Sequence, residues 1–228
     1  MMNMSYILLV MLPGLALAGA ASWFTKRTFT KYAKYVAASR LTGAQAARQM
    51  LDTNGLQDVK VERVQGFLSD HYNPMTRTLR LSPAVYDQPS LSAIGVACHE
   101  AGHAMQHANH YFPLHLRSAL VPITNIGSSA AYWVIAAGAI MQSQSLIGLG
   151  LICFALAVLF AFVTLPVEWD ASARAKRVMV SSRIVTPQES VHAGTVLNAA
   201  FLTYVAAAVS ALLQFLYFFL RYTGGSRD

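Results

Sequence analysis

The stretch "VACHEAGHAMQHANHY" spans residues 96–111 and repeats histidine every four positions, at His99, His103 and His107. Only 12% of the 228 residues are charged and 55% are hydrophobic, so this group of imidazoles around one glutamate is unusual for the chain. Residues four apart lie on one face of an α-helix. That face is either a metal site or the polar side of an ordinary helix, and the rest of the sequence decides between them.

The segment from His99 to His103 matches H-E-x-x-H, a pattern typical of zinc hydrolases. Both imidazoles can reach one ion, and two neutral nitrogens leave that ion with a net positive charge. Glu100, outside the ligand set, can hold a water beside the ion and accept its proton. The sequence therefore predicts one Zn²⁺ with His99 and His103 as ligands and Glu100 as catalytic base; the choice of zinc rests on ligand type.

A catalytic zinc ion has three protein ligands, so a third must be found. His107 continues the spacing, but one straight helix cannot easily supply three ligands, and Asn109 occupies the third-histidine position of the metzincin pattern. A remote carboxylate is the usual alternative. The candidates are Glu62, Asp70, Glu168, Asp170 and Glu189. We choose Glu168, because two apolar stretches separate it from His103 and return the chain to the same side of a membrane.

Two other histidines are candidates for supporting roles. His71, in "SDHYNP", could stabilise an oxyanion or orient substrate, although a lone histidine in a strand loop is more often structural. His107, if it is not a ligand, could support the site from behind or simply face water.

Four uncharged stretches are long enough to cross a bilayer as helices, which takes about 17–25 residues. They are residues 5–24, 123–142, 145–165 and 199–220. The second is the weakest, because small polar residues dilute its first turns. We therefore expect a polytopic, mainly α-helical membrane protein with four transmembrane helices.

Basic residues are concentrated in two of the segments between these stretches. The chain has 17 Lys and Arg, of which 11 fall in residues 25–122 and four in residues 166–198. Basic residues mark cytoplasmic loops. We therefore expect the N-terminus outside and residues 39–122 and 166–198 together in the cytoplasm. The excess of basic residues then indicates the lipid bilayer as partner and not a nucleic acid.

The cytosolic segments contain local signals for a small α+β unit. Residues 42–55 read as a short helix with a capping box, and residues 59–82 as a small antiparallel sheet of two or three strands. Residues 90–108 read as a helix capped by Ser90. Residues 186–190 start a last helix that runs into the fourth apolar stretch.

Several linked motifs resemble the YugP-like family of bacterial membrane zinc metallopeptidases over about residues 40–220. They are "VACHEAGHAMQHA", "PLHLRSALVPITNIGS", "LPVEWDASARA" and "VLNAAFLTYVAAAVSALLQ". The resemblance implies a multi-pass protein of the bacterial inner membrane, with His99, His103 and Glu168 as ligands and Glu100 as base. HtpX-like gluzincins are more distantly similar and carry E-x-x-x-D at the third ligand. Ser172 replaces that aspartate here, so its support of a ligand histidine stays open.

These observations predict a zinc-dependent metalloendopeptidase with a zincin-like cytosolic unit that hydrolyses polypeptides, misfolded membrane proteins among them. The resemblance also suggests that the sheet at 59–82 offers an edge strand to an extended substrate. An intramembrane protease is a weaker alternative, because the apolar part of 91–106 is short. A non-proteolytic scaffold held together by zinc is the other alternative, but structural zinc has no use for Glu100.

Overall fold

The mainly helical fold expected from the sequence is present in the computed structural model, which describes residues 4–66 and 69–223. The chain divides into two units. Unit 1 contains Met1–Ala21, His115–Pro166 and Thr203–Asp228, and unit 2 contains Ser22–Leu114 and Val167–Leu202. Every predicted site residue lies in unit 2.

The described residues form helices along most of the chain and a single small sheet. The strands are β1 (Lys60–Arg63), β2 (His71–Asn73) and β3 (Thr78–Leu81). The helices are α1 (Met4–Tyr6), the π-helical turn η1 (Ile7–Met11), α2 (Leu12–Tyr32), α3 (Gly43–Thr53), α4 (Pro83–Tyr86), α5 (Leu91–Ala108), α6 (Phe112–Ile140), α7 (Gln144–Ser181) and α8 (Pro187–Thr223).

The predicted helix starts are confirmed by their caps. Thr42 and Gln45 form both bonds of a capping box at α3. The Ser90 side chain accepts the Ala93 N–H at the start of α5, at 3.2 Å. The last helix, α8, begins at Pro187 and continues without interruption through the fourth apolar stretch. These side chains satisfy backbone donors that an uncapped helix would leave without partners.

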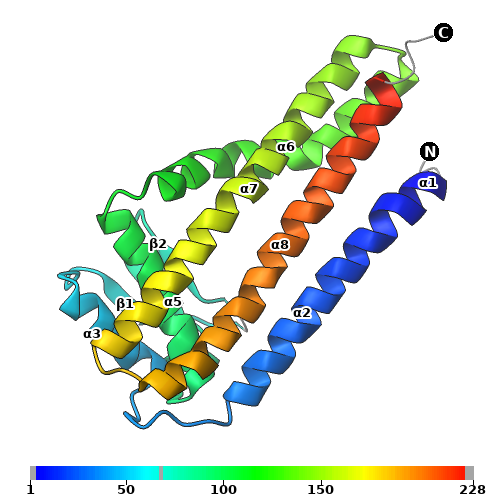
Figure 1. Cartoon of the computed structure of the whole chain (residues 1–228). Helices are drawn as coiled ribbons and strands as arrows, with labels where there is room; N and C mark the ends of the chain where they lie inside the picture. Colours follow the sequence, from blue (N-terminus) through cyan, green and yellow to red (C-terminus); the bar gives the residue numbers. More distant parts are fainter. Residues whose placement is uncertain (1–3, 67–68, 224–228) are drawn as a thin grey trace. The chain divides into compact units, whose positions relative to one another are not determined.

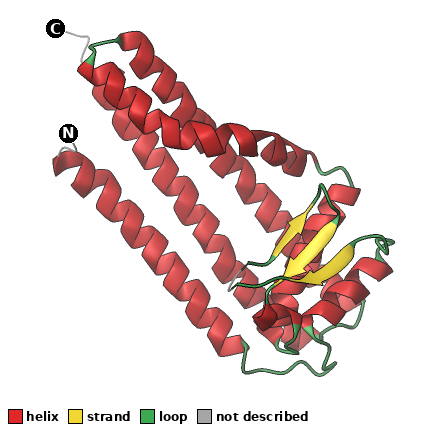
Figure 2. Ribbon diagram, turned by 180° about the vertical axis from the view of Figure 1, so that it is seen from behind, coloured by secondary structure: helices red, strands yellow, loops and turns green. Residues whose placement is uncertain are grey.

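The sheet is mixed, so the prediction of an antiparallel sheet is wrong for one of its two strand pairs. β2 and β3 form an antiparallel hairpin in which Tyr72 lies opposite Leu79, and the predicted turn at Asn73-Pro74 joins them. β1 pairs with β3 in parallel, with Val61 also opposite Leu79. Because β2 occupies one edge of β3, β1 is left to the other edge, and the order is β1-β3-β2 (Figure 2).

Three of the four expected membrane spans lie in helices that, among the described residues, are long and apolar enough to cross a bilayer. These helices are Met4–Tyr32, Gln144–Ser181 and Pro187–Tyr222. The stretch 123–142 lies mostly in α6, and among the residues described there Ala130–Ile140 is found as a shorter apolar helix.

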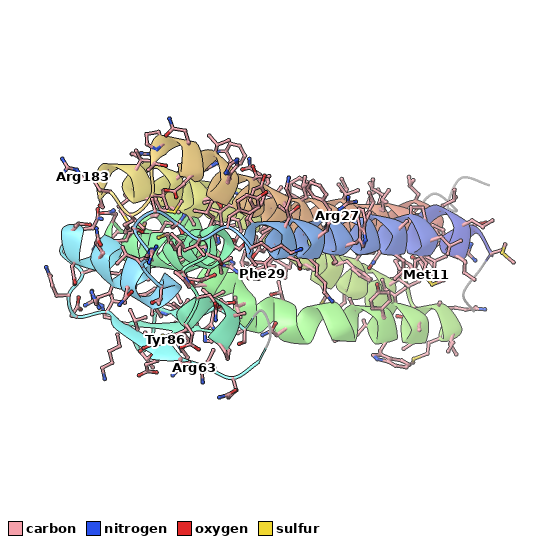
Figure 3. The ribbon with its side chains drawn as sticks, turned by 90° about the horizontal axis from the view of Figure 1, so that it is seen from below. Met11, Arg27, Phe29, Arg63, Tyr86 and Arg183 are labelled. Atoms are coloured by element: carbon pink, nitrogen blue, oxygen red, sulfur yellow. The ribbon has the colours of Figure 1, made fainter. Side chains whose placement is uncertain are left out.

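The core of unit 2 forms around the helix that carries H-E-x-x-H. α5 packs against α3, α4 and strands β2 and β3 (Figure 1). Phe29 of α2, labelled in Figure 3, belongs to the same core. Its side chain is 8% exposed. A side chain at Gly43 would collide with the Val85 carbonyl oxygen, so the first turn of α3 can lie against α4 only with glycine there. This packing holds the helix that carries H-E-x-x-H against α3, α4 and the sheet.

Unit 1 has a separate core, in which α6 meets α7. Ala131 and Ile135 of α6 are buried together with Leu151 and Phe154 of α7. Gly150 lies so close to α6 that a Cβ there would collide with Ile135. Small residues of this kind let apolar helices approach closely, as they do in membrane proteins.

Candidate metal centre

His99, His103 and Glu168 bring one ligand atom each to a common point, with all three atoms within 4.8 Å of one another. Glu168 Oε2 lies 3.1 Å from His99 Nε2 and 3.5 Å from His103 Nε2. Glu168 is 1% exposed. A buried carboxylate is costly unless it is paired or holds a cation. The structure therefore brings together the three residues that the sequence nominated as ligands.

The spacing of these atoms fits a tetrahedral zinc ion. Bonds of about 2.0–2.2 Å to nitrogen and oxygen put neighbouring ligand atoms about 3.4 Å apart. The two distances from Glu168 Oε2 to the imidazoles are close to that value. Two imidazoles and one carboxylate also leave a fourth position for water, as in catalytic His₂Glu sites. The donor set and these two distances fit the metal that the motif predicts.

Two helices supply the three candidate ligands, and a glycine lets the helices approach. α5 carries both histidines on one face, with their ring centroids 4.8 Å apart. α7 carries Glu168 two residues after Pro166. Gly102 lies between the histidines, and a Cβ there would be 2.6 Å from the Ala171 carbonyl oxygen. The H-E-x-x-H helix can therefore contact α7 this closely only because one of its two variable positions is glycine.

Glu100 faces the sheet from the same helix and lies outside the ligand cluster. Its Oε2 accepts the backbone N–H of Tyr72 at 3.0 Å. The hydroxyl of Tyr72 lies 2.9 Å from Nδ1 of His107, one turn further along α5 than His103. Tyr72 of β2 thus contacts α5 through both its backbone N–H and its side-chain hydroxyl. This arrangement orients the Glu100 carboxylate.

Each of the two ligand histidines has a partner at its other ring nitrogen. Nδ1 of His99 lies 3.0 Å from Oγ of Ser172, four residues after Glu168. Nδ1 of His103 lies 2.9 Å from Oε1 of Gln106, which is fully buried. Partners of this kind fix the rotation of a ring and leave Nε2 directed toward the metal.

The surroundings of His103 shift its protonation. Burial opposes the cationic form, but the hydrogen bond and the charge of Glu168 outweigh it, so the pKa of His103 rises above its usual value. Cys98, next to His99, is fully buried, and burial raises the pKa of its thiol. Since metals bind the thiolate, Cys98 is a packing residue rather than a ligand.

The other candidate residues lie outside the three-residue cluster. His71 is exposed on β2, and its Nδ1 is 2.8 Å from the Ser69 carbonyl oxygen. His107 contacts Tyr72, as described above. The alternative carboxylates have other partners: Glu62 pairs with Arg80, Asp70 accepts from Ser82, Glu189 accepts from Thr186 and Ala38, and Asp170 accepts from Gln106 and Arg174.

Two residues that contact the site, Gln106 and Tyr72, were not predicted from the sequence. Gln106 follows His103 by three residues and so shares its helix face, which was the available signal. Tyr72 had no such signal, because any residue except proline at that position supplies the backbone N–H that Glu100 accepts.

Comparison with known proteins agrees with this geometry. The family described as "Putative neutral zinc metallopeptidase" matches residues 6–223. The chain is 46% identical over 211 residues to the "Putative membrane protease YugP" of Bacillus subtilis (strain 168), which covers 92% of this chain and 94% of that protein. No solved structure matches the chain significantly.

Proposed function

This chain belongs to the neutral zinc metallopeptidase family, and from that premise we propose that it is a membrane-bound, zinc-dependent endopeptidase. Its site would consist of His99, His103 and Glu168 as ligands and Glu100 as catalytic base. The observation that carries the proposal is the convergence of the three ligand atoms beside a glutamate that is not one of them. A site that only stabilised the fold would not need this fourth group.

Zinc, when bound, would polarise the carbonyl of the scissile peptide and make water acidic enough to attack at neutral pH. Glu100 takes the proton from the attacking water and passes it to the nitrogen of the leaving amine. The Tyr72 N–H holds the Glu100 carboxylate in position for both transfers. Ser172 orients His99 from behind, and His71, on the exposed face of β2, is a candidate for contact with substrate.

A polypeptide in extended conformation is the substrate that this site fits best. β2 is an edge strand, and its Tyr72 N–H points away from the sheet toward Glu100. A peptide laid along this edge would pass over the α5 face that carries the candidate ligands, while the Tyr72 N–H stays bonded to Glu100. Backbone pairing selects for extended chain rather than for sequence. Misfolded or membrane-associated proteins present such segments.

Four membrane spans and a cytoplasmic site are part of the proposal. His103 and Glu168 lie in the same unit, so the chain between them must cross a membrane an even number of times. α7 offers one crossing, and α6 must therefore supply another through residues 123–142, despite its polar first turns. Together with the spans at 5–24, 145–165 and 199–220, this makes four crossings. The segments 25–122 and 166–198, which carry most of the basic residues, then lie on the cytoplasmic side of a bacterial inner membrane, and the N-terminus lies outside.

Glu100→Gln separates this proposal from a zinc-stabilised scaffold. The full-length protein, purified in detergent and loaded with zinc, would be incubated with fluorescently labelled casein as an unfolded polypeptide. We expect wild type to release peptides, and Glu100→Gln to lose about 10²–10⁴-fold in rate while it keeps its zinc. Equal rates for the two proteins, both with full zinc, would support the scaffold.

A further inference from the structure

We propose that Gln106 is a positioning residue that sets the tautomer of His103, so that Nε2 of this ring is the atom that binds metal. The inference rests on the proposed role of His103 as a zinc ligand. Gln106 is 0% exposed, and its side chain makes three hydrogen bonds. Satisfying so many bonds in the interior restricts the side chain to one orientation.

The partners of the Gln106 amide nitrogen decide which way the amide points. This nitrogen donates to the Val167 carbonyl oxygen and to Oδ2 of Asp170, each at 2.8 Å. A carbonyl oxygen can only accept. Oδ2 of Asp170 also accepts the Nε–H of Arg174 at 2.6 Å, and a guanidinium has no acceptor. A flipped amide would turn its oxygen toward two acceptors, so the flip is excluded.

The amide oxygen of Gln106 therefore faces Nδ1 of His103, at 2.9 Å. An amide oxygen cannot donate, so Nδ1 of His103 must carry the proton in the neutral ring. The lone pair is then on Nε2, the nitrogen that lies 3.5 Å from Glu168 Oε2. In the metal-free protein a proton on Nε2 faces Glu168, and a metal would take the place of that proton while Nδ1 keeps its own.

Asp170 completes this arrangement from α7. Its ion pair with Arg174 is within one helix, and the Arg174 guanidinium lies 5.8 Å from the Tyr111 ring centroid, just beyond the end of α5. Asp170 stands two residues before Ser172, the position where HtpX-like enzymes carry an aspartate. The carboxylate thus acts on His103 through Gln106, while Ser172 contacts His99.

The two histidines are not controlled equally. The hydroxyl of Ser172 can donate or accept, so it does not dictate the tautomer of His99. Gln106 has no such freedom. Loss of Gln106 should therefore weaken metal binding more than loss of the Ser172 hydroxyl.

The test is zinc affinity, measured by competition with a chelator, for wild type, Gln106→Met, Asp170→Asn and Ser172→Ala. Methionine keeps the length and volume of glutamine without its hydrogen bonds. We expect Gln106→Met to lose about 10–100-fold in affinity, and Asp170→Asn and Ser172→Ala to lose less. Nitrogen-15 NMR of histidine-labelled, zinc-loaded protein reports the tautomer directly. The Nδ1–H signal of His103 should be protected from exchange in wild type and lost in Gln106→Met, with His99 unchanged.

Two outcomes would overturn the inference while leaving the proposed function intact. One is wild-type affinity in Gln106→Met. The other is a zinc-loaded wild type in which His103 binds metal through Nδ1. If Gln106→Met does not fold, the tautomer of His103 in zinc-loaded wild type decides by itself, and metal bound through Nδ1 overturns the inference. A wild type that binds no zinc would instead overturn the proposed function, and the inference with it.

Discussion

The backbone N–H of Tyr72 donates to the Glu100 carboxylate at 3.0 Å, which attaches an edge strand directly to the predicted catalytic base. The Tyr72 hydroxyl contacts His107 on the same helix. A substrate strand laid against β2 would therefore lie beside the residue that we propose as the base. The two contacts of Tyr72 can be separated by mutation, because only one of them involves the side chain.

Tyr72→Phe should keep the Glu100 contact and remove the contact with His107. We expect the free energy of unfolding to fall by about 0.5–1.5 kcal/mol, the usual value of one hydrogen bond, with zinc content unchanged. Chemical denaturation in detergent measures this. Tyr86→Phe is the matched control, because the Tyr86 hydroxyl has no hydrogen-bond partner in the part of the chain that the structure describes. A loss of zinc in Tyr72→Phe would mean that Tyr72 supports the ligands themselves.

His107→Ala should retain its zinc, because His107 lies outside the ligand cluster although it continues the spacing of His99 and His103. Elemental analysis of the purified variant checks this, with His103→Ala as the variant expected to lose metal. If His107→Ala emptied the site and Glu168→Ala did not, three ligands would come from one helix and the assignment of Glu168 would be wrong.

Gly102→Ala should destabilise the protein by about 1–3 kcal/mol and lower its zinc affinity, because the added methyl group would push α5 away from the Ala171 carbonyl. Gly148→Ala is the control. Nothing lies within 4 Å of a Cβ built there, so the same change in α7 should be neutral or slightly stabilising. Thermal unfolding in detergent compares the two variants, and equal midpoints would show that α5 and α7 are not in tight contact at Gly102.

The zinc-free protein should lose stability as pH rises above the usual histidine pKa of 6.5. The pKa of His103 is higher in the folded state than its usual value of 6.5, because Glu168 favours the cation more than burial opposes it. The stabilising interaction is therefore complete below the unfolded pKa and is lost as pH rises through the folded one. Unfolding of the chelator-treated protein across this range measures the slope, and His103→Gln should flatten it. A slope of the opposite sign would mean that burial dominates.

The sequence predicted those parts of the molecule that depend on local spacing. H-E-x-x-H needs only one helix, so the positions of His99, Glu100 and His103 follow directly from their order. Glu168 could be predicted because the number of membrane crossings determines which distant segments lie on the same side of the membrane. The parallel pairing of β1 with β3 could not be predicted, because a turn at Asn73 indicates a hairpin but not which strand β1 pairs with. Gln106 was missed because its role depends on α7 atoms 61 and 64 residues away.

The number of membrane spans is also hard to predict from local sequence. A hydropathy pattern judges each stretch by itself, and Asn125 and its polar neighbours weaken the second one. The contact between His103 and Glu168 adds a constraint that no single stretch contains, because it requires both ends of residues 104–167 to lie on one side. The four-span topology places the loop at residues 141–143 outside the cell. A cysteine introduced there should be labelled from outside intact cells, and labelling only from the cytoplasmic side would contradict this topology.

Zinc content of the full-length protein tests the central claim most directly, in wild type, His103→Ala, Glu168→Ala and Glu62→Ala. Glu62 is the matched control, because it is also a glutamate of unit 2 but pairs with Arg80 away from the cluster. We predict about one zinc per chain in wild type and Glu62→Ala, and loss of zinc in the other two. Full zinc occupancy in Glu168→Ala would contradict the assignment of the third ligand, and an absence of zinc from wild type would contradict the metal centre itself.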